Sequence, residues 1–484
     1  MKTNRILYIL PIALGLVACE PEFEDIDFND GSADFTSFVT VGNSLTAGFQ
    51  SNALRREKQE VSLSAMLAGQ LKLVGSGEFK QPLMDPGVGL GPAGNAEFGL
   101  FIKQGCDPSR PPSLSPGPIA PQGQLDQLAP SNFIGSNGPF NNIGVPGARL
   151  SNLNQVGYGS SQGNPYFARF ASNPGETMIQ AAMRNNPTFF ELWIGNNDVL
   201  GYSTSGGDEG GDAMTDPTTF ANDFNKVLDS LRKGGAQGVI ANIPYVTSIP
   251  YFTTVKWNAL VLTQAQANLL NGAFAAYNGA LGVPSIAGQL TQPNEVNKRK
   301  ITFQAGPNGF LTLDNDLSTA FVDTMGNQLP KYRQLTAGEL VTLTISQDAI
   351  RCSGLGSVNT TVNPPQPNPI TGEFILDTDE VASINARVDD FNDIIKSEAS
   401  ARGLAFVDAN KRLRELASAG ITISGITFTD EFVSGGAFSL DGVHPSTRGY
   451  AIIANDFIKA INGKYNANVP QVDVASYPAL EVGQ

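Results

Sequence analysis

The chain contains a single histidine, His444, in the stretch SLDGVHPSTRGY. If the protein uses an imidazole as a general base, the base must be this residue. Asp441 lies three residues earlier, and in a tight loop its carboxylate could accept a hydrogen bond from one imidazole nitrogen. Such a bond fixes the tautomer and stabilises the imidazolium that forms during proton transfer. The alternative is a structural histidine in a loop that caps a helix beginning at Ser446, and the spacing alone favours that alternative.

A candidate nucleophile, Ser44, follows an apolar run and a glycine in the stretch FVTVGNSLTAG. A serine between a strand and the first turn of a helix exposes its hydroxyl at the carboxyl edge of the sheet. Its backbone N–H points into the same space, and the helix dipole makes that space favourable for negative charge. Acyl transfer needs such a nucleophile together with a base, an orienting acid and donors for the oxyanion. The alternative is that Ser44 only caps a helix.

Two further stretches could supply oxyanion donors. In NIGVPGA, residues 142–148, a strand runs into a glycine turn, and the N–H of Gly147 could approach a substrate oxygen without interference from a Cβ atom. In IGNND, residues 194–198, the side-chain amide of Asn197 could donate directly after a strongly apolar strand. The sequence therefore offers each of the groups that acyl transfer requires.

These four stretches, in this order along the chain, resemble the signature blocks of the SGNH hydrolases, also called the GDSL esterase/lipase family. The resemblance places Ser44 at the nucleophile position, Gly147 and Asn197 at the oxyanion positions, and Asp441 and His444 at the D-x-x-H of the last block. It implies a flavodoxin-like three-layer α/β/α sandwich around a parallel sheet, with Ser44 also donating its N–H to the oxyanion. It further implies ester hydrolysis without a cofactor.

The chain departs from the family pattern at Asn43, where the first block has an aspartate before the serine. That aspartate is not the triad acid, so we expect hydrolysis to survive, with Asn43 making local hydrogen bonds without the charge. Nearby residues have simpler interpretations. We expect Asp198 to hold its turn, Arg149 to form a surface ion pair rather than bind a substrate anion, and Trp193 to belong to the sheet core rather than to a sugar platform.

The elements around these residues alternate between strands and helices, which favours a parallel sheet covered on both faces. Ligands of such sheets bind at the carboxyl ends of the strands, which is where the candidate residues lie. The expected strands are 36–41, 142–145, 188–194, 238–243 and 404–409, and the expected helices are 62–73, 177–185, 218–233, 263–281, 379–402 and 446–461.

Two long insertions interrupt this alternation in a hydrolase domain expected over residues 36–463. Residues 80–140 are rich in Gly and Pro and lack a sustained period, which is typical of an irregular insertion. Residues 291–368 contain the short β-like runs KITFQA, GFLTLD and LVTLTI, which indicate a small β-rich subdomain. We expect residues 464–484 to form a C-terminal tail.

The N-terminus resembles a bacterial lipoprotein signal. Residues 1–18 combine basic residues with an apolar stretch too short to span a bilayer, and Cys19 would become the lipidated first residue. The alternative is a plain secretory signal. The acidic residues 19–35 would form a tether. We therefore expect a lipid-anchored protein of the cell envelope, in the outer membrane, with surface exposure as one option.

The remaining composition limits cofactors and partners. Cys106 and Cys352 either form a disulfide or remain two free thiols, and the sequence does not favour one over the other. No His/Cys/Asp cluster has metal-ligand spacing, and no phosphate-binding loop is present. A net charge of -14 argues against a nucleic-acid partner.

The sequence thus predicts a serine esterase that acts on an acyl lipid or an acetylated glycan. The alternative from another class is a surface-anchored glycan- or lipid-binding lipoprotein that keeps a hydrolase fold without its chemistry.

Overall fold

The computed structural model describes residues 27–87, 89, 91, 97–106, 111–119, 133–359 and 361–478. The predicted signal segment and the lipidation site Cys19 lie outside these ranges. Among the helices of the described part, none is long and apolar enough to cross a bilayer.

The core of the molecule is a five-stranded sheet with the strand order β15-β6-β5-β1-β4. Every neighbouring pair in it is parallel, so the five carboxyl ends meet at one edge. The strands are β1 (Phe38–Gly42), β4 (Asn142–Gly144), β5 (Phe189–Trp193), β6 (Gln237–Ala241) and β15 (Ala405–Val407). The predicted α/β fold with a parallel sheet is confirmed.

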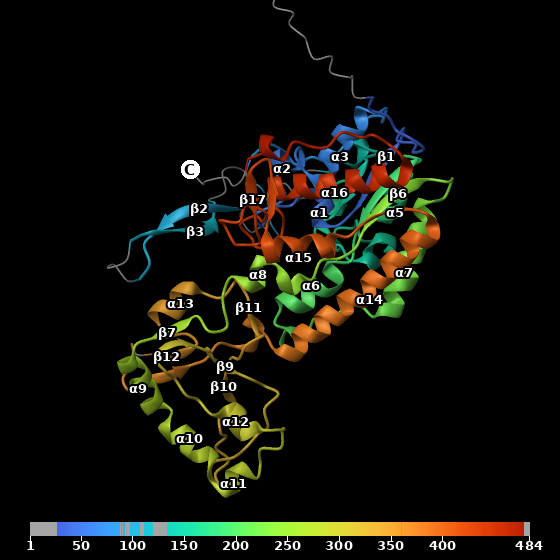
Figure 1. Cartoon of the computed structure of the whole chain (residues 1–484). Coiled ribbons are helices and arrows are strands. Elements are labelled where there is room, and N and C mark those ends of the chain that lie inside the picture. Colours follow the sequence, from blue (N-terminus) through green and yellow to red (C-terminus); the bar gives the residue numbers. More distant parts are fainter. Residues whose placement is uncertain are drawn as a thin grey trace, which may run out of the picture.

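Helices cover both faces of this sheet (Figure 1). On one face, α16 packs against α3 and contacts β5 through the ring pairs Trp193–Phe457 and Phe189–Tyr465. On the other face, α7 packs against α14, where the rings of Phe220 and Phe391 stack 3.9 Å apart. The bounds are α3 (Leu63–Lys72), α5 (Met178–Met183), α7 (Pro217–Leu231), α14 (Thr378–Arg402) and α16 (Thr447–Tyr465).

The starts of these helices follow from side-chain caps in the sequence. Ser62, Thr177, Asp216, Asp377 and Ser446 each accept a hydrogen bond from a backbone N–H of the first turn, which satisfies donors that have no partner inside the helix. The expected helices outside residues 263–281 are therefore present with small shifts at their ends.

Glu191, in the middle of β5, is a fully buried carboxyl group. It lies opposite Thr40 of β1, and neither of its carboxyl oxygens has a hydrogen-bond partner among the described residues. Burial raises the pKa of Glu191 well above its ordinary value, because the charged form would lose its hydration. Glu191 therefore keeps its proton to a higher pH in the folded protein than in the unfolded chain.

This burial predicts a pH-dependent stability. Above the pKa of the unfolded state, near 4.5, the unfolded chain releases the Glu191 proton and the folded chain retains it. The free energy of unfolding then falls as pH rises, by at most about 1.4 kcal/mol per pH unit from this group. We expect Glu191→Gln to remove this slope in urea unfolding as the pH is raised above 5. The control is Glu78→Gln, whose side chain is 90% exposed; equal slopes in both variants would contradict the prediction.

A second region forms its own small hydrophobic clusters apart from the sandwich, at the lower left of Figure 1. It starts near Val255, earlier than the insertion expected at 291, and runs to about residue 376. Its strands are β7 (Leu260–Leu262), β8 (Gly306–Asn308), β9 (Leu311–Leu313), β10 (Tyr332–Gln334), β11 (Leu340–Val341), β12 (Ser357–Asn359), β13 (Gln366–Asn368) and β14 (Ile375–Leu376). They pair as short antiparallel ribbons. Its helices are α9 (Gln264–Ala273), α10 (Ala275–Leu281), α11 (Pro284–Ala287), α12 (Glu295–Arg299) and α13 (Gln347–Cys352).

Two expectations for this region are corrected by the structure. The residues expected as one helix, 263–281, are helical but form two helices, α9 and α10, which pack in the small region. The run KITFQA is not a strand, because asparagine side chains bind its backbone. Asn278 bonds both the N–H and the C=O of Ile301, and Asn271 does the same for Phe303.

The first insertion contains an antiparallel hairpin, β2 (Phe98–Lys103) with β3 (Ser113–Pro118), where no regular structure was expected. Just after β2, Cys106 forms a disulfide with Cys352 at the end of α13, with 6.0 Å between the Cα atoms. The two insertions are thus covalently joined.

The ends of the domain differ from the expected tether and tail. Phe35 is buried and packs against the ring of Phe189, so the tether ends before it. At the other end, Val472 is buried, and its backbone exchanges two hydrogen bonds with the Asn455 side chain of α16.

The remaining α-helices and strands are α1 (Ser44–Ala47), α2 (Arg56–Gln59), α4 (Pro165–Ala168), α6 (Asn197–Thr204), α8 (Pro250–Thr253), α15 (Ala409–Ala419) and the hairpin β16 (Ile421–Ile423) with β17 (Ile426–Phe428).

Candidate active site

Ser44 is the first residue of α1, directly beyond the carboxyl end of the central strand β1. The turn before it is tight: a Cβ on Gly42 would lie 2.2 Å from Thr46 Oγ1 and 2.5 Å from the Trp193 carbonyl oxygen. Asn43 caps α1, because its side-chain oxygen accepts the N–H of Leu45 at 3.0 Å. The substitution of Asn for the family's Asp therefore leaves a local capping bond in place.

The loop before α16 brings His444 to Ser44 although the two residues are 400 positions apart. His444 Nε2 lies 2.9 Å from Ser44 Oγ, and Nδ1 lies 2.9 Å from Asp441 Oδ2. With the Nδ1 proton directed at the carboxylate, Nε2 is free to accept the serine proton. The imidazole also packs against the Phe49 ring, 4.8 Å between centroids.

Asp441 is held by more bonds than the one to the imidazole. Its Oδ1 accepts the backbone N–H groups of Val443 and His444 and the hydroxyl of Ser439, and its Oδ2 accepts the N–H of Asn52. Burial alone would raise the pKa of Asp441, but the charge and hydrogen bonds of His444 and the bond from Asn52 lower it to about 2. The carboxylate is therefore ionised and fixed in place at neutral pH.

The two predicted oxyanion loops flank Ser44, because β4 and β5 are the neighbours of β1. Gly147 has a φ of +81°, and a Cβ added there would meet only Asn164 Nδ2, at 3.8 Å. Among the hydrogen bonds of the described residues, none uses the N–H of Ser44 or of Gly147. Asn197 Nδ2 donates one hydrogen to the Ala148 carbonyl at 2.9 Å, which leaves its second hydrogen for another acceptor.

The neighbouring polar residues have structural partners. Asp198 is buried and accepts the Leu150 N–H at 2.9 Å and the Thr215 hydroxyl at 2.7 Å, so it joins the two oxyanion loops. Arg149 forms an ion pair with Asp212 at 2.5 Å. The described residues contain no cluster of three or more His, Cys, Asp or Glu side chains that could hold a metal ion.

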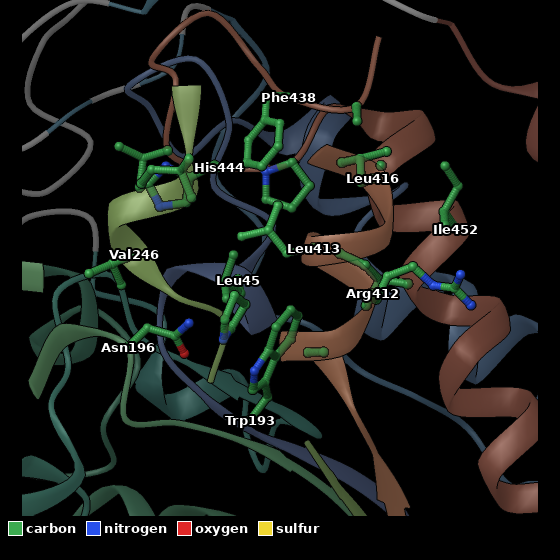
Figure 2. Close-up of a pocket in the computed structure, with 18 of the residues that line it drawn as sticks. Leu45, Trp193, Asn196, Val246, Arg412, Leu413, Leu416, Phe438, His444 and Ile452 are labelled. Carbon is green, nitrogen blue, oxygen red and sulfur yellow. The ribbon is translucent and has the colours of Figure 1, made fainter. Parts of the chain in front are cut away.

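A pocket with a volume of about 110 Å³ opens beside Ser44 and His444 (Figure 2). One wall comes from α15, an element that we did not expect, because its sequence ANKRLRELASA is mostly polar. The buried Leu413 and Leu416, three residues apart, are the signal that could have revealed an apolar stripe on this helix.

Comparison with known proteins identifies one family. Residues 271–457 match the family model described as GDSL-like Lipase/Acylhydrolase. The matched segment includes Asp441 and His444, and Ser44, Gly147 and Asn197 lie outside it. No curated protein matches the chain. The match and the α/β architecture are consistent with the SGNH resemblance of the sequence, and residues 271–457 are similar to a GDSL-like lipase/acylhydrolase.

Proposed function

We propose that the protein is a serine esterase in which Ser44, His444 and Asp441 form a catalytic triad. The observation that carries the proposal is the continuous hydrogen-bond chain from the Ser44 hydroxyl through the imidazole to the Asp441 carboxylate. A serine hydroxyl is a weak nucleophile unless a base takes its proton. The only histidine of the chain is in position to do so.

In the proposed reaction, Ser44 Oγ attacks the ester carbonyl carbon while His444 Nε2 takes the serine proton. The negative charge on the carbonyl oxygen is stabilised by the N–H groups of Ser44 and Gly147 and by the Asn197 amide. His444 then gives the proton to the leaving alcohol, and an acyl-serine ester remains. A water molecule, deprotonated by His444, hydrolyses that ester and restores the free serine.

Two measurements test the proposal. The wild-type protein should hydrolyse short p-nitrophenyl esters, and a fluorophosphonate probe should label it covalently. Ser44→Ala should do neither, whereas Ser64→Ala, which removes another buried hydroxyl, should retain labelling if it folds. Labelling of Ser44→Ala, or turnover undiminished in it, would overturn the proposal. A protein that binds glycans or lipids without hydrolysis would show no labelling in any form.

We further propose that the domain is anchored to the outer membrane through a lipid on Cys19. The support for this proposal is the N-terminal sequence alone. Metabolic labelling with a palmitate analogue tests this proposal. The wild-type protein should be labelled, and Cys19→Ala should not be.

A further inference from the structure

The pocket beside Ser44 extends in one direction along the carboxyl edge of the sheet. Ser44 follows β1, and the lining residues then come from the ends of β5, β6 and β15 and from the facing helices α15 and α16. Gly147, which follows β4, is not part of the lining. The pocket therefore runs away from the Gly147 side of the nucleophile.

The walls of this pocket are almost wholly apolar between its two ends. At one end stand Ser44 and His444, with asparagines beside them. Across the pocket in Figure 2 stands Arg412, whose guanidinium points away from the cavity and pairs with Asp456 at 2.5 Å. The residues between these ends include Trp193, Val246, Leu413, Leu416, Phe438 and Ile452.

We propose that this pocket holds an unbranched acyl chain of the ester substrate, so that the natural substrate is a lipid-like ester rather than an acetylated glycan; the inference rests on the proposed function. A sugar placed here would leave hydroxyl groups buried without partners, which is unfavourable. A hydrocarbon chain would lose only its contact with water and gain packing contacts.

The pocket suits the acyl part of the ester better than its alcohol part. The acyl group stays on Ser44 after the first step, whereas the alcohol must leave and water must enter before the second. Walls without hydrogen-bonding groups are a poor route for both the alcohol and water. The leaving group and the hydrolytic water therefore use the side of Ser44 that faces away from this pocket.

The test varies the two halves of the ester separately. In one series the acyl chain grows from acetate to octanoate on p-nitrophenol, and in the other ethyl to octyl acetates are compared. We expect kcat/KM to rise up to about fourfold per methylene in the acyl series while the pocket fills, and to change little in the alcohol series. An acyl series without a rise, or a rise confined to the alcohol series, would overturn the assignment.

Substitutions on α15 test whether the dependence of kcat/KM on acyl-chain length arises in the pocket. Leu416→Trp should fill it and lower the octanoate-to-acetate ratio of kcat/KM at least tenfold, and Leu416→Ala should shift the preferred acyl chain to greater length. Ala417→Trp adds the same side chain at the next position of the helix, which is exposed, and should leave the ratio unchanged. An unchanged octanoate-to-acetate ratio in both Leu416 variants would overturn the assignment of this pocket to the acyl chain and leave the proposed esterase function intact. Absence of turnover on every ester, acetate included, would overturn the proposed function with it.

Discussion

Replacing His444 with alanine should reduce kcat/KM for p-nitrophenyl acetate by about 10⁴-fold or more. Among the described residues, the imidazole is the only group that hydrogen-bonds Ser44 Oγ and can take its proton. The chain has no second histidine to substitute for it. Circular dichroism and the thermal midpoint would show whether the variant remains folded. A folded His444→Ala protein with more than a tenth of wild-type turnover would contradict the assignment.

Asp441→Asn tests the proposed triad through the orientation of the imidazole. The amide can present its NH₂ group to Nδ1, which favours the tautomer that carries the proton on Nε2 and cannot accept from Ser44. We expect a loss of about 10⁴-fold in kcat. Since the pKa of Asp441 is about 2, its titration should not contribute to the pH profile of the wild-type enzyme near neutrality. Equal pH profiles for the wild type and Asp441→Asn, with equal rates, would contradict this role.

The residues of the candidate site could be predicted because each sits in a short segment whose local structure follows from its own sequence. An apolar strand followed by Gly42 and a polar cap positions Ser44, and a D-x-x-H turn before a capped helix positions His444. Parallel strands then bring the segments of Ser44, Gly147 and Asn197 to one edge of the sheet. The turn with His444 follows no strand of that sheet and reaches Ser44, 400 positions away, from the loop before α16.

The parts that the sequence did not predict depend on contacts between distant residues. The run KITFQA has the composition of a strand, yet Asn271 and Asn278 of the preceding helices bind its backbone and replace a partner strand. The disulfide joins residues 246 positions apart; the sequence offered this pair and two free thiols as open alternatives, because no local pattern encodes that proximity. Helix α15 was missed because only a narrow stripe of it is buried: Leu413 and Leu416 join the main hydrophobic core and line the pocket, whereas most of the other side chains are polar or exposed.

Replacing Asn197 with alanine should lower kcat by about 10² to 10³-fold and change KM little, because the lost donor acts mainly on the oxyanion of the transition state. Asn197 also bonds the Ala148 carbonyl, so part of the loss could come from movement of the Gly147 loop. Asn164→Ala separates the two effects, since Asn164 Nδ2 supports the same loop through the Pro146 carbonyl at 2.8 Å.

If Asn197 acts as an oxyanion donor, Asn164→Ala should lose much less kcat than Asn197→Ala at a similar cost in thermal stability. The two are compared by steady-state kinetics on p-nitrophenyl acetate and by thermal unfolding. Asn197→Asp adds a third comparison, because it keeps the size of the side chain but replaces the donor with a charge that repels the oxyanion. It should be at least as impaired as the alanine variant. Equal losses of kcat in Asn164→Ala and Asn197→Ala would instead make Asn197 a positioning residue for the loop of Gly147.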